Sequence, residues 1–344
     1  MNLRFNIEYI TKWGECLFLH YSDKKVKMTP DGEGHWCAEI ETSSLDEFNS
    51  YHYEVELHGR FERREWRHHS LENLNLKIKS GKKSSSERIE INDFWQTVSR
   101  CAGTAIPVFS LRSRDSFGVG EFNDLKLMAD WAAATGQKVL QLLPINDTTM
   151  TGTWVDSYPY SANSIYALHP QFINLIAAGV PADEEYVRLR DELNSLPAID
   201  YERVNSEKDR LMREAFKAKG RSVCATKNYK KFVAENSHWL LPYAAFRILT
   251  AKFGTADFSK WEDWSKYDRH AVENLLKKEK QECNYHCFIQ YHLHCQLTEA
   301  RNYAHSRGVY LKGDLPIGIS PTSADAWASP ELFHLDSQAG APPD

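Results

Sequence analysis

The sequence has little that would mark an exported or membrane-bound protein. Four charged residues interrupt the first fifteen positions, namely Arg4, Glu8, Lys12 and Glu15. A signal peptide or a membrane span needs an uninterrupted apolar stretch, so we expect neither. The seven cysteines are an odd number and lack the spacing of a disulfide framework. These features predict a reduced protein of the cytoplasm with no membrane partner.

Strong charge of one sign is also missing, as are several catalytic motifs. The formal net charge is only -5, which gives no reason to expect a nucleic acid or an anionic surface as partner. No G-x-x-x-x-G-K-[ST] segment occurs, and GVGE at 118–121 is too short to form a phosphate loop. No Ser-His-Asp spacing stands out either.

One segment, CNYHCFIQYHLHC at 283–295, superficially resembles a metal site. Cys283 and Cys287 are four residues apart on one helix face, and His286 is adjacent. Structural zinc sites usually take ligands from turns as well as from a helix. The apolar stripe that continues through Ile289 and Leu293 is typical of an ordinary packed helix. We therefore predict a structural segment and no metal site.

The chain of 344 residues suggests roughly two domains. In residues 1–80, the segments LRFNIEYI and HWCAEIE alternate apolar and polar residues, and YHYEVELHG follows them. This pattern predicts an all-β sandwich of short strands. Residues 81–97 begin with a Ser- and Lys-rich stretch and are expected to form a solvated linker. A β-α pattern then starts in residues 98–344.

The second region reads as alternating strands and helices. A continuous apolar run such as Val139–Ile145 is typical of a parallel strand buried on both faces. About three such β-α units are expected, fewer than the eight that would close a (β/α)₈ barrel. In order, we predict a strand at 104–111, a turn at Gly118 and Gly120, a helix from Asn123 or Asp124 through Thr135 ended by Gly136, the strand at 139–145, a helical insertion at about 182–298, a helix closing at 299–307 and a third strand at 308–317.

Asp314 stands where that third strand is expected to emerge. A carboxylate at the end of a buried strand is costly unless it has partners. The residues alone therefore leave two interpretations open, a hydrogen-bonding scaffold or a site residue. Tyr160, taken as a lone tyrosine between Pro159 and Pro170, would be structural.

Several motifs in order over 101–344 resemble the amylomaltases, the 4-α-glucanotransferases of glycoside hydrolase family 77. They are GTAIPVFSLRSRDSFGVGEFNDLK, QLLPINDT, DSYPYSANSIYALHP, KGDLPIGI, SADAW and GAPPD. The resemblance implies a (β/α)₈ barrel with an inserted helical subdomain. It also implies retaining transfer of glucosyl or maltodextrin units between α-1,4-glucans such as maltose, maltodextrin, glycogen and starch, with no cofactor.

The same resemblance assigns roles to individual residues. Tyr160 would lie in the glucose-binding cleft, and Asp314 would support that cleft through hydrogen bonds. The nucleophilic aspartate and the acid/base glutamate of the family lie beyond the GAPPD-like motif, that is, beyond Asp344. We therefore expect no catalytic residue in this chain, which would be the amino-terminal part of a longer enzyme and inactive alone.

The first sixty-odd residues resemble the starch-binding modules of carbohydrate-binding module family 20, through FNIEYITKWGECLFL, YHYEVE and the Glu65–Trp66 pair. The resemblance places Trp66 at the ring that stacks on glucose and Trp13 at a second site, whereas Trp36 is expected in the core. The family's G-x-W segment after the second strand is missing. The usual platform of two tryptophans is therefore incomplete.

Two other functions remain open at this point. A non-catalytic α-glucan-binding protein would fit the chain taken literally, and the ten tryptophans agree with either kind of sugar-binding protein. A weaker alternative is an α-amylase-type hydrolase, which would release simple hydrolysis products.

Overall fold

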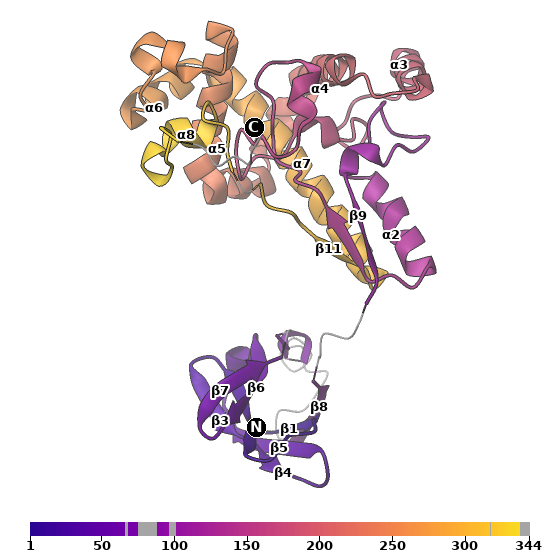
Figure 1. Ribbon diagram of the computed structural model, residues 1–344, viewed down its shortest axis with the longest axis vertical. Coiled ribbons are helices and arrows are strands. Elements are labelled where there is room, and N and C mark those ends of the chain that lie inside the picture. Colours follow the sequence, from indigo (N-terminus) through magenta and orange to yellow (C-terminus); the bar gives the residue numbers. More distant parts are fainter. Residues whose placement is uncertain (66–67, 75–87, 96–100, 317, 338–344) are drawn as a thin grey trace. The chain divides into compact units, whose positions relative to one another are not determined.

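The computed structural model describes residues 1–65, 68–74, 88–95, 101–316 and 318–337. The chain divides into two compact units, Met1–Arg100 and Cys101–Asp344 (Figure 1). All seven cysteines are free thiols. Within the described ranges, no helix combines the length and the apolar character that crossing a membrane requires.

The first unit is built from short strands. Its strands are β1 (Asn2–Glu8), β2 (Glu15–Tyr21), β3 (Lys24–Lys27), β4 (Thr29–Pro30), β5 (His35–Glu41), β6 (Tyr51–Leu57), β7 (Arg60–Arg64) and β8 (Arg88–Phe94). They form two four-stranded sheets with the orders β4-β5-β1-β8 and β3-β2-β6-β7. Every pairing is antiparallel except that of β1 with β8, which is parallel.

Period-two alternation explains how both sheets share one core. Phe5 of β1 and Leu19 of β2 are fully buried, as is Tyr53 of β6, and all three belong to the same hydrophobic cluster. Trp36 is also in this cluster and donates its indole N–H to the carbonyl of Tyr9 at 3.0 Å. The prediction that Trp36 is a core residue is confirmed.

The predicted linker over residues 81–97 is wrong for residues 88–94. These residues form β8, in which Ile89 and Ile91 are buried against the core while Glu90 between them is exposed. The register pairs Asn2 with Arg88. The polar, alternating sequence resembled a solvated segment because only one face of this edge strand is covered.

The second unit combines a small parallel sheet with many helices. Its strands are β9 (Gly103–Ile106), β10 (Val139–Leu142) and β11 (Tyr310–Lys312), in the order β11-β10-β9. Its helices are α2 (Asp124–Ala134), α3 (Glu184–Ser195), α4 (Tyr201–Ala225), α5 (Lys227–Phe253), α6 (Arg269–Lys278), α7 (Lys280–Ser306) and α8 (Ala324–Ala328). Short 3₁₀ segments lie at Val108–Ser110, Trp154–Ser157, Pro170–Phe172, Phe258–Lys260, Glu262–Trp264 and Pro330–Leu332.

The three strands are shorter than predicted. Pro107 and Pro144 follow β9 and β10 closely, and proline has no N–H to continue a ladder. The burial of β10 also differs from the prediction, because Leu140 and Leu142 are buried but Val139 and Gln141 are only half-buried. On that half-buried face, the amide oxygen of Gln141 accepts a hydrogen bond of 3.0 Å from Lys312.

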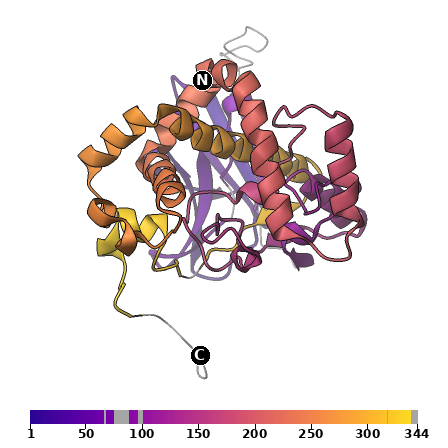
Figure 2. The same ribbon diagram turned by 90° about the horizontal axis from the view of Figure 1, so that it is seen from above.

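The helical insertion does not end at about residue 298, as predicted. Helix α7 is continuous from Lys280 to Ser306 and passes through that position. Its last turns pack with α2 beside the sheet, where Ala304 shares a small core with Ala132 and Leu140 (Figure 1). Its earlier turns pack with α4 and α5 around the loops that follow β10 (Figure 2). A single helix therefore joins the helical insertion to the sheet.

Close packing fixes the turn between β9 and α2. Gly118 has φ +75°, and a Cβ there would lie 2.7 Å from Cβ of Leu193 on α3. A Cβ on Gly120 would lie 1.9 Å from the carbonyl oxygen of Val108. Both predicted turn glycines are thus required by the approach of neighbouring segments. Gly136, with φ +75°, follows α2 as predicted.

A fully buried ion pair attaches helix α4 to this turn. Lys208 Nζ lies 2.5 Å from Glu121 Oε1 and donates to the carbonyls of Gln171 and Ile173, each at 2.7 Å. The other carboxylate oxygen of Glu121 accepts from the side-chain amide of Asn174 at 2.7 Å. Burial lowers the pKa of Lys208 and raises that of Glu121, so each charge depends on the other.

We predict that Lys208→Met destabilises the second unit by about 3–5 kcal/mol, because it leaves Glu121 buried without a counter-charge. The double change Lys208→Met, Glu121→Gln should recover part of this loss. Urea unfolding of the single and double variants measures both effects. An unchanged midpoint for Lys208→Met would show that the pair does not contribute.

Candidate active-site loops

Tyr160 and Asp314 lie together at the carboxyl ends of β10 and β11. The hydroxyl of Tyr160 donates to Oδ2 of Asp314 at 2.9 Å, although 154 positions separate them in the sequence. Both side chains are half-buried. The hydrogen bond to Asp314 raises the pKa of Tyr160. The two predicted substrate residues thus form one pair, at the edge of a parallel sheet where α/β proteins place their sites.

A fully buried aspartate holds the loop that carries Tyr160. Asp147 accepts hydrogen bonds from the hydroxyl of Tyr243 at 2.7 Å, from the hydroxyl of Thr149 at 2.7 Å and from the amide of Asn163 at 3.3 Å. Burial would raise the pKa of Asp147, but Arg247 and the hydrogen bonds bring it below its usual value. The carboxylate is therefore charged and fully engaged.

The loop after β10 is tied directly to the segment after β11. The backbone N–H of Ala324 lies 2.9 Å from both the side-chain and the main-chain oxygen of Asn163. Asp325 accepts from the N–H of Ile165 at 2.6 Å. The segments DSYPYSANS and SADAW, distant in sequence, are thus adjacent in the fold. These contacts keep the two halves of the Tyr160–Asp314 pair in place.

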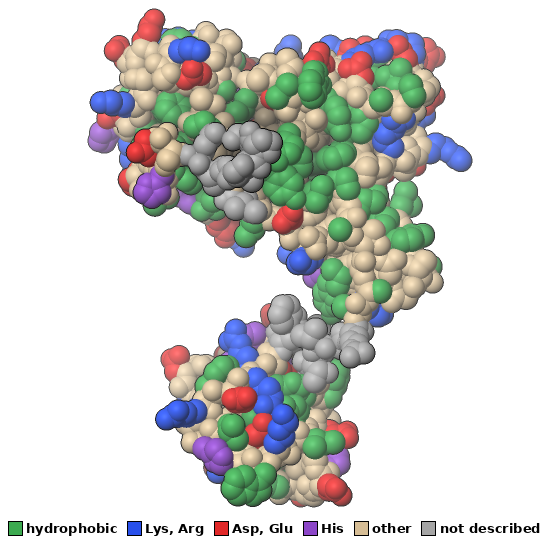
Figure 3. Space-filling view, in the orientation of Figure 1, with side chains coloured by type: hydrophobic (Ala, Val, Ile, Leu, Met, Phe, Trp, Pro, Cys, Tyr) green, Lys and Arg blue, Asp and Glu red, His purple; other side chains and the backbone are tan. Residues whose placement is uncertain are grey.

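A compact turn before Tyr160 presents aromatic side chains to solvent. Asp156 is buried and accepts from the backbone N–H groups of Thr151 and Gly152, at 3.0 and 2.8 Å. Trp154 is 68% exposed and Tyr158 is 60% exposed. Figure 3 shows one face of the second unit, on which hydrophobic side chains gather. The ring of Tyr158 lies 5.8 Å from that of Tyr160, so an exposed aromatic ring adjoins the pair.

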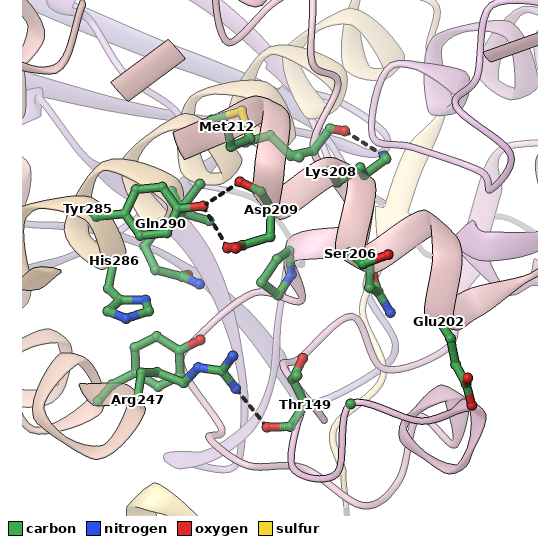
Figure 4. Close-up of a pocket in the computed structure, with 16 residues that line it drawn as sticks. Thr149, Glu202, Ser206, Lys208, Asp209, Met212, Arg247, Tyr285, His286 and Gln290 are labelled. Atoms are coloured by element: carbon green, nitrogen blue, oxygen red, sulfur yellow. Dashed lines mark hydrogen bonds between the residues drawn. The ribbon is translucent and has the colours of Figure 1, made fainter. Parts of the chain in front are cut away.

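A separate cavity of about 230 Å³ lies between α4, α5 and α7 (Figure 4). Arg247 on one wall donates to the carbonyl of Thr149 at 2.8 Å, and Tyr285 on another donates to Asp209 at 2.8 Å. His286 lines the same cavity. Neither Tyr160 nor Asp314 lines it. Thr149 and Gly152 of the loop also line the cavity, together with residues of the three helices.

Of the two predicted starch-binding tryptophans, Trp13 lies among the described residues. Trp13, in the β1–β2 loop, is 90% exposed and has one edge-on ring contact, to His58 at 5.8 Å. Trp66 lies outside the described residues. Its neighbour Glu65 is buried and accepts from the N–H of Tyr53 at 2.8 Å.

Sequence reasoning missed Asp147, Asn163 and Arg247 as supports of the site. A signal for Asp147 was present, because it follows the buried run of β10 just as Asp314 follows β11. No sequence signal marked Arg247 and Tyr243, because they lie about a hundred positions after Asp147, in the long helix α5. Cys283 and Cys287 lie on α7 and are buried in the hydrophobic core of the second unit. This agrees with the prediction that their segment is part of a packed helix.

We predict a pH-dependent contribution to stability from His169, which precedes Pro170 in this loop. Its ring is buried, and burial lowers its pKa to about 4. The unfolded chain therefore binds more protons between about pH 6.5 and 4, and stability falls by about 1.4 kcal/mol for each pH unit in that window as pH decreases.

The replacement His169→Asn tests this contribution, because an amide oxygen can accept from the N–H of Gln171 as Nδ1 does at 3.1 Å. Urea unfolding at several pH values should show a shallower pH dependence for the variant than for the natural chain. Parallel curves for the two would contradict the role of His169.

Comparison with known proteins agrees with these motifs. A family model described as 4-alpha-glucanotransferase matches residues 106–344. A 4-alpha-glucanotransferase of rice (Oryza sativa subsp. japonica), named DPE2, is 42% identical over 71% of this chain and 26% of its own length. A 4-alpha-glucanotransferase of Chlamydia pneumoniae is 33% identical over 70% of this chain and 46% of its own. The chain thus spans about half or less of these relatives.

Solved structures show the same fold. The amylomaltase of Streptococcus agalactiae in complex with acarbose has a TM-score of 0.60 at 24% identity, over 68% of this chain and 47% of that one. The amylomaltase of Corynebacterium glutamicum has a TM-score of 0.54 at 17% identity, over 100% of this chain and 47% of that one. With the match over residues 106–344, they assign the fold of the second unit. The chain belongs to glycoside hydrolase family 77, the 4-alpha-glucanotransferases.

Proposed function

We propose that the protein containing this chain transfers glucosyl or maltodextrin units between α-1,4-glucans, and that Tyr160 and Asp314 bind the sugar. The observation that carries the proposal is their hydrogen bond at the carboxyl ends of two parallel strands. Maltose, maltodextrin, glycogen and starch are the proposed substrates. No cofactor is required by the retaining reaction, in which two carboxylates act.

The proposed architecture is a (β/α)₈ barrel of which β9, β10 and β11 are the first three strands. Their parallel order supports it, as does a helix in each crossover. The half-buried face of β10, with Gln141 bonded to Lys312, would become interior when further strands close the barrel. The outer face is already covered by α2 and α7.

Within the proposed cleft, the two residues have different tasks. The ring of Tyr160 offers an apolar face to a glucose ring, and Tyr158 lies beside it. Asp314 holds the Tyr160 hydroxyl with Oδ2, which leaves Oδ1 to accept a hydrogen bond from a sugar hydroxyl. Both are binding and positioning groups, and the reacting carboxylates of the family would lie beyond Asp344.

For the first unit we propose a starch-binding β-sandwich of the family 20 type. Two sheets around one core support the fold, and the exposed indole of Trp13 supports a sugar contact. Trp66 is the proposed partner ring at the main site. The cytoplasmic location inferred from the cysteines also stays a proposal.

We predict that Asp314→Asn in the full-length gene product lowers kcat by roughly ten- to a hundredfold, because a charged hydrogen bond in the cleft is lost. Tyr160→Phe keeps the ring but removes the donor, so its effect should be smaller. Disproportionation of maltotriose, followed by chromatography of the products, measures both. Tyr303→Phe is a matched control, since Tyr303 also bonds to an aspartate, Asp130, but on α2.

The outcomes separate the proposed function from its alternatives. Longer glucans from maltotriose indicate transfer, whereas glucose and maltose alone would indicate an α-amylase-type hydrolase. No product from the full-length protein would favour a non-catalytic α-glucan-binding protein. If Asp314→Asn reacts as fast as the natural protein and the control, the pair is not part of the cleft.

We predict that Trp13→Ala weakens binding to amylopectin several-fold, because a stacked ring contributes about 1 kcal/mol. Affinity electrophoresis of the natural chain and the variant measures the change in retardation. Trp131→Ala, which removes an exposed indole from the second unit, is the control. Equal retardation of the natural chain and Trp13→Ala would exclude a sugar contact at Trp13.

A further inference from the structure

Two histidines face each other on the outer side of the β3-β2-β6-β7 sheet. His20 of β2 and His52 of β6 are directly paired in the antiparallel register. Their imidazole rings lie 5.1 Å apart between centroids and are nearly parallel, at 23°. Glu54 is two residues farther along β6 and therefore lies on the same face. The intervening Tyr53 is fully buried on the opposite, core side.

The ring nitrogens of both histidines converge on the Glu54 carboxylate. His52 Nε2 lies 3.2 Å from Oε1, and His20 Nε2 lies 3.0 Å from Oε2. The Nε2 atom of His20 is buried, and its contact with Oε2 does not have the geometry of a hydrogen bond. One ligand atom from each of the three residues lies within 4.8 Å of the other two. In the described part of the chain, this is the one cluster of three such side chains with that geometry.

We propose that His20, His52 and Glu54 bind one divalent transition-metal ion of the zinc class. Imidazole nitrogen and carboxylate oxygen both bind Zn²⁺ at about 2.0–2.2 Å, which places tetrahedral ligands roughly 3.4 Å apart. The two histidine nitrogens lie 3.0 and 3.2 Å from different oxygens of the Glu54 carboxylate, and one ligand atom from each residue lies within 4.8 Å of the others, so small side-chain rotations would bring three ligands to one ion. Two histidines and one glutamate also leave a fourth position for water. The site is independent of the proposed transferase function.

The neighbouring strand supplies a competitor for the carboxylate. Lys25 of β3 is paired with His20, and its Nζ lies 3.5 Å from Glu54 Oε2. Lys25 also forms an ion pair with Glu56, so it keeps a partner when a metal ion takes Glu54. A cation at this position raises the free energy of a bound metal ion by charge repulsion. Removing the lysine should therefore tighten metal binding.

A metal ion here would connect β2 and β6, the two central strands of the sheet. Because the histidines and Glu54 come from both strands, the site exists only when these strands are paired. An ion that binds the folded but not the unfolded chain stabilises the fold by mass action. The proposed ion would thus stabilise the folded state of the first unit.

The test is titration of the full chain with Zn²⁺ against a colorimetric chelator, with His52→Gln and His20→Gln as variants. Each should weaken binding by roughly ten- to a hundredfold or more, since even changes outside the ligand set cost that much. His35→Gln, an exposed histidine of the same unit, should bind as the natural chain does. Equal affinity of His52→Gln and His35→Gln would overturn the proposal.

Two further measurements distinguish this site from the seven cysteines and from a folding defect. Co²⁺ bound at the site should show a spectrum of nitrogen and oxygen ligands, and a thiolate charge-transfer band would overturn the assignment. Lys25→Gln, which removes no ligand, should bind Zn²⁺ several-fold more tightly than the natural chain. Unchanged or weaker binding in Lys25→Gln would also contradict the geometry.

Discussion

The candidate site depends on one buried carboxylate, that of Asp147. The chain between β10 and the 3₁₀ turn at Pro170 has little regular secondary structure, yet much of it is buried. Backbone and side-chain polar groups in such a segment must find partners inside the protein. Asp147 supplies acceptors to Thr149, Asn163 and Tyr243 at once. Asn163 in turn anchors the segment after β11, so the position of Tyr160 beside Asp314 follows from this carboxylate.

The helical insertion provides the other half of that support. The side-chain amide of Gln290 on α7 forms two hydrogen bonds with the backbone of Leu168. It accepts from the N–H at 2.9 Å and donates to the carbonyl at 2.8 Å. Gln296, nearly two turns later, does the same for Asn174, at 2.8 and 3.0 Å. Each glutamine pairs with the backbone as a neighbouring strand would. Helix α7 therefore satisfies backbone groups of the loop in the way that a neighbouring strand would. The helical insertion thus helps to position the candidate site.

The sequence predicted features that depend on neighbouring residues, and it missed contacts between residues that are far apart in the chain. Tyr160 and Asp314 were identified because each stands in a short motif, and Trp36 through the resemblance of its segment to the starch-binding modules. Strand β8 was missed because its pairing with β1 joins residues 86 apart, and only its pattern of two isoleucines hinted at it. Tyr243 and Asp147 are 96 positions apart. Local periodicity carries no information about such partners, which depend on how helices pack.

In the proposed enzyme, the groups that bind the glucan and the groups that react with it would come from different parts of the chain. The described contacts that support Tyr160 and Asp314 link the loop after β10 to α5, α7 and α8, within Cys101–Asp344. If the reacting carboxylates come from later strands of a closed barrel, this part supplies preformed binding groups. Binding groups that hold substrate and transition state equally affect KM, whereas only contacts stronger in the transition state raise kcat. The ratio of the two effects for Asp314→Asn therefore shows whether Asp314 merely receives the glucan or also stabilises its distortion.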